Sequence, residues 1–175
     1  MSMKKLTLAA AIVAGMALTP AAFAVDGTIT FNGNVLATTC TINSGTPNFT
    51  VTLPDVSTNV LAVSGDVAGQ TAFNIALSSC SANATASAYF EQGPNIDATT
   101  GNITNSGTAT NVQIQLVNSD GTSAINLLTP TSNTTTAAVT STSGGTLTYY
   151  ARYFATGVST AGTVTATEQY TINYN

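Results

Sequence analysis

Apolar side chains recur at every second position in several segments of this chain, and this period most constrains its fold. A period of two places successive side chains on opposite faces of an extended strand. No segment after residue 24 has the period of an amphipathic helix. The alternating faces are Gly27, Ile29, Phe31, Gly33 and Val35, then Phe49, Val51 and Leu53, then Phe73, Ile75 and Leu77.

Further strand-like segments follow at similar spacing and are separated by turn-forming residues. Turns are predicted at residues 118–121 and 143–145, and the Thr- and Ser-rich residues 129–143 are expected to form a loop with one short edge strand. Seven or eight strands at this spacing predict an all-β sandwich or barrel. The remaining predicted strands are residues 84–90, 112–117, 124–128, 147–154 and 163–174.

The first 24 residues have the three parts of a secretory signal peptide. Lys4 and Lys5 precede an apolar run over residues 6–18, and Ala22 and Ala24 supply small residues two positions apart. The apolar run is shorter than the roughly 20 residues of a membrane-spanning helix. We therefore expect cleavage after Ala24, export of the chain, and one mature domain that begins at Val25.

The mature chain contains two cysteines and very few basic residues. Cys40 and Cys80 have neither a CxxC spacing nor a histidine nearby, so in an exported chain they predict a structural disulfide. After cleavage one basic residue, Arg152, remains against seven acidic ones, so the net charge is near −6. Such a surface cannot neutralise phosphates, and nucleic acid is excluded as a partner.

No catalytic, metal-binding or cofactor-binding site is predicted. The chain has no histidine, its carboxylates are scattered, and its many hydroxyl groups have no neighbouring base. Metal sites would need ligand clusters that the sequence does not contain. The aromatic cluster Tyr149, Tyr150, Tyr153 and Phe154 has two interpretations, a sugar-stacking platform or a strand packed in the core. Arg152 is expected to pair with a carboxylate at the surface or at an interface.

Three parts of the chain carry recognisable motifs. The first is residues 25–35 followed by Cys40-Thr41-Ile42. The second is Phe73-Asn74-Ile75-Ala76-Leu77 leading to Cys80. The third is residues 151–157, with Gly162 fourteenth from the end and Tyr174 penultimate. Together these parts resemble one family, the major subunits of type 1-like, chaperone-usher fimbriae, whereas residues 82–146 carry no signature of their own.

The resemblance implies an immunoglobulin-like sandwich that lacks its last strand. Residues 25–36 would be a donor-strand extension, and residues 37–175 the pilin domain. The extension of one subunit would complete the sandwich of the next by strand addition, with Gly27, Ile29, Phe31, Gly33 and Val35 facing the groove. The product would be a shaft used for adhesion and biofilm formation.

The resemblance also implies assembly partners. A periplasmic chaperone would cover the groove first, and an outer-membrane usher would pass subunits to the surface. The chaperone would bind the final strand, where the alternating face is interrupted by Glu168. Its expected contacts are Gly162, Val164, Tyr170, Ile172, Tyr174 and Asn175. Two alternatives stay open: a minor, adaptor-type pilin, and a freestanding secreted carbohydrate-binding β-sandwich.

Overall fold

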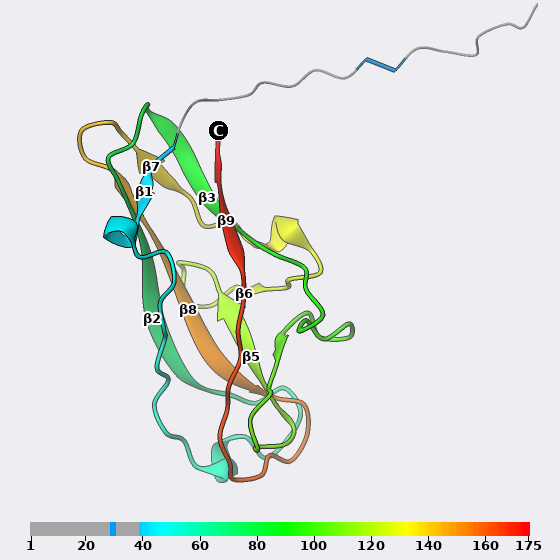
Figure 1. Ribbon diagram of the computed structural model, residues 1–175. Coiled ribbons are helices and arrows are strands. Elements are labelled where there is room, and N and C mark those ends of the chain that lie inside the picture. The colour runs from blue at the N-terminus through cyan, green and yellow to red at the C-terminus, as the bar shows by residue number, and fades with distance from the viewer. Residues whose placement is uncertain (1–28, 31–38) are drawn as a thin grey trace, which may run out of the picture. The chain divides into compact units, whose positions relative to one another are not determined.

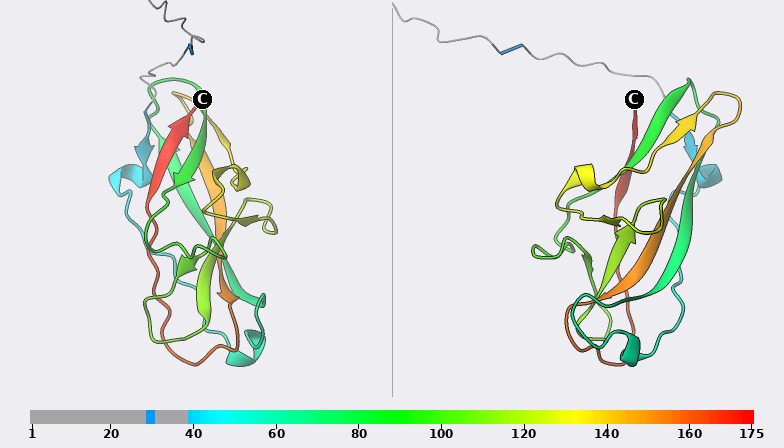
Figure 2. Two further views of the ribbon diagram at one scale, coloured as in Figure 1. Left: turned by 90° about the vertical axis from the view of Figure 1, so that its right-hand side faces the viewer. Right: turned by 180° about the vertical axis from the view of Figure 1, so that it is seen from behind.

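Two antiparallel sheets face each other in the computed structural model, which describes residues 29–30 and 39–175 (Figures 1 and 2). The first sheet contains, in order, β1 (Thr41–Ile42), β2 (Val67–Ser78), β8 (Gly145–Ala155), β5 (Val112–Val117) and β4 (Ile103–Thr104), with β6 (Ala124–Ile125) also paired to β5. The second sheet contains, in order, β7 (Ala137–Val139), β3 (Ala84–Phe90) and β9 (Tyr170–Tyr174).

The prediction of an all-β sandwich is confirmed. Within the described residues the only helices are three short 3₁₀ segments: η1 (Asn43–Gly45), η2 (Thr58–Val60) and η3 (Pro130–Ser132). None of these helices is long or apolar enough to cross a membrane.

The longest ladder joins β2 to β8. Register runs from Val67 opposite Phe154 to Leu77 opposite Gly145, with a bulge between Ala68 and Thr71. Gly69 lies in the bulge with a φ of +66°, a conformation that side chains disfavour. Beyond the bulge the predicted alternation buries Ile75 and Leu77 between the sheets.

Small residues on one sheet face large residues on the other in the core. Ala86 and Ala88 of β3 are buried, which leaves room for the fully buried Tyr149 of β8. The Tyr149 ring stacks on Phe73 at a centroid distance of 5.8 Å and meets the edge of Phe90 at 5.2 Å. Its hydroxyl accepts hydrogen bonds from the Ala88 N–H and the Asn133 amide, so the buried phenol is satisfied.

Several predicted elements agree with the structure and three do not. Residues 84–90 and 112–117 are strands, residues 147–154 lie inside β8, and β7 is the short edge strand. The turn at residues 118–121 closes with the Gly121 N–H donating to Asn118 O at 3.0 Å. Three predicted strands are wrong in extent: residues 49–53 join no ladder, only Ala124–Ile125 pairs within 124–128, and only Tyr170–Tyr174 within 163–174. An alternating segment becomes a ladder strand only where a partner backbone lies beside it.

Candidate functional site

An open groove of about 1680 Å³ runs along the sandwich between two extended segments. One wall is residues 47–58, which precede β2, and the other is residues 159–171, which lead into β9; both run along the body in Figure 1. The floor is apolar and belongs to the core. Its residues include Phe73, Ile75, Phe90, Ile103, Ile114, Leu116, Ala151 and Tyr153.

The C-terminal wall is hydrogen-bonded to the body on one side only. The carbonyl oxygens of Thr163 and Thr165 accept from Ala109 N (3.0 Å) and Ser106 N (2.8 Å), and Gln169 O accepts from Glu91 N (2.9 Å). β9 then pairs with β3 and with no other described strand. Because backbone groups alternate in direction along a strand, those of the even-numbered residues point away from the body. Among the described residues this wall therefore presents an unpaired backbone edge to the groove.

The side chains of the same even-numbered positions point inward. All six are half-buried, and five of them pack against the core. The face predicted for the final strand is thus present, although most of its length lies outside a ladder. Its members are Val164, Ala166, Glu168, Tyr170, Ile172 and Tyr174.

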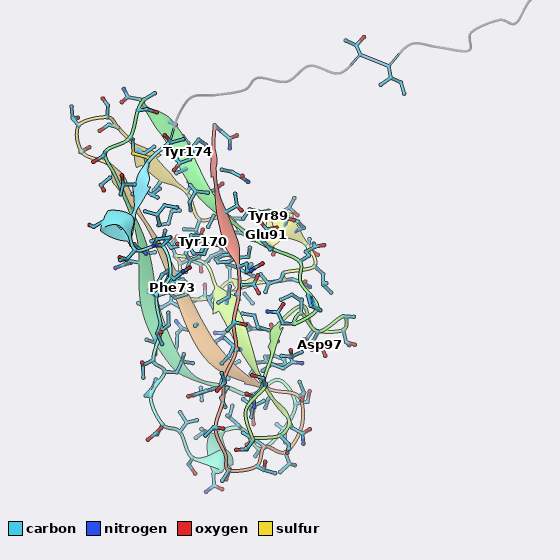
Figure 3. All side chains as sticks on the ribbon, viewed as in Figure 1. Phe73, Tyr89, Glu91, Asp97, Tyr170 and Tyr174 are labelled. Atoms are coloured by element: carbon cyan, nitrogen blue, oxygen red, sulfur yellow. A yellow bond between two sulfur atoms is a disulfide. The ribbon has the colours of Figure 1, made fainter. Side chains whose placement is uncertain are left out.

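The N-terminal wall has free backbone groups as well. Within the described residues no backbone group of residues 48–56 bonds to another backbone group. The ring of Phe49 lies 6.1 Å from that of Phe73 and 6.2 Å from that of Tyr170. Figure 3 labels Phe73 and Tyr170. Tyr170 also spans the groove, donating its hydroxyl to Pro47 O at 2.8 Å. The alternation over residues 49–53 correctly predicted side chains that face inward. It wrongly predicted a strand that is hydrogen-bonded into a sheet.

Together the walls and floor form a site for one extended strand. Such a strand could bond to an unpaired backbone edge on each side while alternate side chains enter the apolar floor. An uncovered edge of this length is an aggregation hazard in a finished protein. The groove therefore has the properties of a strand-acceptor site.

Glu168 is the one charged member of the inward face. Its pKa is raised from 4.5 to about 7, mainly by burial. The nearby Glu91 carboxylate contributes to the rise, while the Asn95 amide and the Gln169 N–H oppose it. Asn95 Nδ2 lies 3.4 Å from Oε2. The other oxygen, Oε1, is buried and has no hydrogen-bond partner among the described residues. Among these residues no group of three or more potential ligands could hold a metal ion.

The residues predicted for strand exchange fall into three groups: some line the groove, some lie beyond it, and some lie outside the described residues. Gly162, Val164 and Tyr170 line the groove, and Ile172 and Tyr174 continue the same face beyond it. Asn175 pairs its backbone with Thr85 at 2.8 and 2.9 Å. Of the donor segment only Ile29 is described, with 78% of its surface exposed. Gly27, Phe31, Gly33 and Val35 lie outside the described residues, as does the signal peptide.

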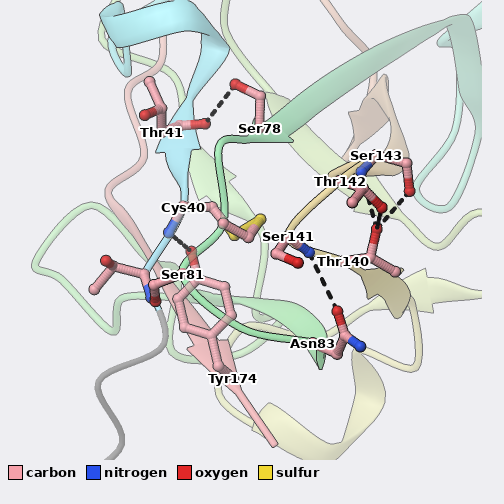
Figure 4. The surroundings of a disulfide bond; sticks show 12 residues. Cys40, Thr41, Ser78, Ser81, Asn83, Thr140, Ser141, Thr142, Ser143 and Tyr174 are labelled. Atoms are coloured by element: carbon pink, nitrogen blue, oxygen red, sulfur yellow. Dashed lines mark hydrogen bonds between the residues drawn. A yellow bond between two sulfur atoms is a disulfide. The ribbon is translucent and has the colours of Figure 1, made fainter.

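The predicted disulfide between Cys40 and Cys80 is present (Figure 4). It joins the residue before β1 to the connection between β2 and β3. The Cys40 N–H donates to the Tyr174 hydroxyl at 3.2 Å, so the end of β9 contacts the same corner.

The remaining candidates do not form a second site. Tyr149 is buried and Tyr153 packs on the core, whereas Tyr150 and Phe154 occupy the alternate positions of β8, so the four rings share no platform. Arg152 donates to Gln115 Oε1 (2.9 Å) and Gln70 Oε1 (3.3 Å) rather than to a carboxylate of the described chain. Sequence reasoning missed residues 47–58 as a groove wall; an apolar alternation lacking a partner strand was the available signal.

Comparisons with known proteins agree on one family. The profile of the family described as Fimbrial protein matches residues 29–175. The F17 fimbrial protein of Escherichia coli is 46% identical over 181 residues, covering 98% of this chain and 99% of that protein. The major fimbrial subunit SMF-1 of Stenotrophomonas maltophilia (strain K279a) is 45% identical over 163 residues, covering 89% and 96%. The solved P pilus rod subunit PapA shares the fold, with a TM-score of 0.55, 17% identity, and coverage of 78% and 99%.

Proposed function

This chain belongs to the fimbrial protein family and is a structural pilus subunit at the cell surface, not an enzyme, and from that premise we propose how it polymerises. Residues 25–36 of one copy fill the groove of the next. Each copy thereby completes the sandwich of its neighbour.

The observation that carries this proposal is the pair of unpaired backbone edges on either side of an apolar floor. The inserted strand would bond to even-numbered residues of the C-terminal wall and to residues 48–56 of the other wall. Ile29 and Phe31 would enter the floor, and each such burial is worth about 1.5–3 kcal/mol. The strand alternates strictly, so a slip of one residue would present Thr and Asn instead.

Head-to-tail contacts of this kind build an open filament. Each copy carries both a groove and a donor segment, so an added copy always leaves one of each free. We therefore propose a repeating position in the shaft. An adaptor subunit would also use both its groove and its donor segment. It would be distinguished from a shaft subunit by its lower copy number in isolated pili.

The test compares substitutions on the two faces of the donor segment. Phe31→Asp would bury a carboxylate without a partner and should reduce pilus yield at least tenfold. Thr30→Ser, on the opposite face, is the matched control and should assemble normally. Pili are sheared from cells and quantified as heat-labile ladders on gels. Equal yields from Phe31→Asp and Thr30→Ser would show that this mechanism is wrong.

We also propose that a periplasmic chaperone covers the groove before an outer-membrane usher exports the subunit. The half-buried face of β9 and its free edge would otherwise be exposed during transit. Deleting residues 172–175 removes the end of that face, so the chaperone should no longer co-purify with the subunit. Phe31→Asp leaves the groove intact and should co-purify normally. An undiminished complex after the deletion would argue against this route.

A further inference from the structure

Glu168 is a charged residue on the inward face, whose other members are all uncharged. It is flanked on the same face by Ala166 and Tyr170, and its Oε1 atom is buried without a partner among the described residues. An apolar side chain placed beside this carboxylate would desolvate it further without offering a hydrogen bond. The carboxylate therefore discriminates among the side chains that can lie next to it.

The alternation of the donor segment allows few alignments on this wall. In these sheets all neighbouring strands are antiparallel, so a strand added beside β9 would run opposite to it. Aligning Gly33 with Glu168 seats all five inward donor positions on the face that ends at Tyr174. A shift of two residues in one direction puts Phe31 beside Glu168. The opposite shift puts Val35 there and moves Gly27 beyond the end of the chain.

The Gly33 alignment also matches side-chain sizes along the inward face, within the groove and beyond it. The two glycines, Gly27 and Gly33, would face the large residues Tyr174 and Glu168, and the small Ala166 would face Val35. The two central pairs would be Ile29 with Ile172 and Phe31 with Tyr170. Cross-strand pairs of this aromatic and β-branched type are favourable in sheets.

Resting on the proposed function, we propose that Glu168 sets the register of the incoming strand, because it admits only a glycine beside it and so aligns Gly33 of the donating copy with itself. Glu168 is thus a specificity-determining residue of the acceptor groove. A strand with a side chain at that position would be rejected or displaced by two residues.

The same geometry links strand insertion to protonation of the Glu168 carboxyl group. The charge that acts on Glu168 is acidic: it is the carboxylate of Glu91, which directly follows β3. A second carboxylate, Asp55, lines the same groove. Arg152, the one base in the described chain, is held by Gln70 and Gln115. An inserted strand removes more water from the carboxyl group, so the inserted state favours its protonated form. Since the pKa is about 7 before insertion, the contact should weaken as the pH rises above 7.

The register is tested by compensation in full-length subunits. Gly33→Leu should lower pilus yield at least tenfold, and adding Glu168→Ala should restore it to within threefold of wild type. Glu91→Ala removes a neighbouring carboxylate outside the inward face, and it should give no rescue. The inference is overturned if Glu168→Ala assembles alone but does not rescue Gly33→Leu, or if Glu91→Ala rescues equally.

The proton coupling is tested with Glu168→Gln, which keeps the side-chain volume and removes the charge. Wild-type filaments in a fixed denaturant concentration should dissociate on the order of tenfold faster at pH 8 than at pH 6, since one pKa unit corresponds to tenfold. Glu168→Gln filaments should show no such change. The same pH dependence in both kinds of filament would overturn the inference. This test also applies if the Glu168→Ala subunit fails to accumulate and the register test cannot be read. Assembly by Phe31→Asp would instead refute donor-strand exchange itself.

Discussion

At the scale of single residues, one buried amide organises the least patterned part of the chain. Asn118 is 1% exposed and lies at the end of β5. Its Oδ1 accepts from Thr134 N (2.8 Å), Thr135 N (3.2 Å) and Thr135 Oγ1 (3.1 Å), and its Nδ2 donates to Ser123 O and Ser132 O. A Thr- and Ser-rich loop that lacks large apolar side chains is thus held by a polar centre.

Replacing that amide should be costly. Asn118→Ala removes the five hydrogen bonds that this side chain makes, so we expect a loss of about 3 kcal/mol in the free energy of unfolding. Asn83→Ala is the matched control, because Asn83 is exposed and its Oδ1 accepts one bond, from Ser141 N at 3.2 Å. It should cost about 0.5 kcal/mol. Denaturant unfolding of the purified subunits measures both, and equal losses would contradict the assigned role.

At the scale of elements, the C-terminal wall depends on a close crossing of two extended segments. Residues 105–109 bond to residues 163–165 through backbone and side-chain groups, including Thr163 N to Thr108 Oγ1 at 2.9 Å. A Cβ atom added at Gly162 would lie 2.5 Å from Ala109 N and 2.8 Å from Thr108 C. The approach that positions this wall therefore requires a glycine.

Adding one methyl group at that crossing should separate the two segments. Gly162→Ala should destabilise the subunit by about 1–3 kcal/mol, because the obstructing atoms are backbone and cannot rotate away. Gly157→Ala is the control, since its Cβ would meet its nearest neighbour, in Asn111, at an ordinary 3.6 Å. Subunit level and melting temperature report the difference. A Gly162→Ala subunit as stable as Gly157→Ala would show that the crossing tolerates a side chain.

At the scale of the whole molecule, a sandwich with one open edge has less burial to stabilise it, so its cross-link matters more. The disulfide closes a loop with a sequence separation of 40 between Cys40 and Cys80. In the chain-entropy model a loop of this size contributes about 4 kcal/mol. It also ties the start of the body to the corner where β9 ends at Tyr174.

Loss of the cross-link should appear before assembly. Cys40→Ser and Cys80→Ser should each reduce the subunit level in the periplasm several-fold. The double substitution should match the single ones, which separates the lost constraint from reactions of a free thiol. Immunoblots of periplasmic extract and counts of pili on cells are the measurements. Normal levels with normal pili in all three variants would contradict the prediction.

The sequence by itself determined what depends on neighbours along the chain. Period two identified the strands at 84–90, 112–117 and 147–154, and the inward faces at 49–53 and 163–174. The turn at 118–121 could also be predicted, because local residue types decide a turn. These features need no knowledge of distant segments.

Only the tertiary structure decided which alternating segments would be paired. Residues 49–53 and the first part of 163–174 have strand-like patterns, yet within the part of the chain that the structure describes each lacks a backbone partner on the groove side. The hydrogen bond from Asn95 and the neighbouring charge of Glu91 likewise reach Glu168 from segments far away in sequence. A pattern of side chains specifies a face, whereas pairing and pKa depend on which groups the fold brings within a few ångströms.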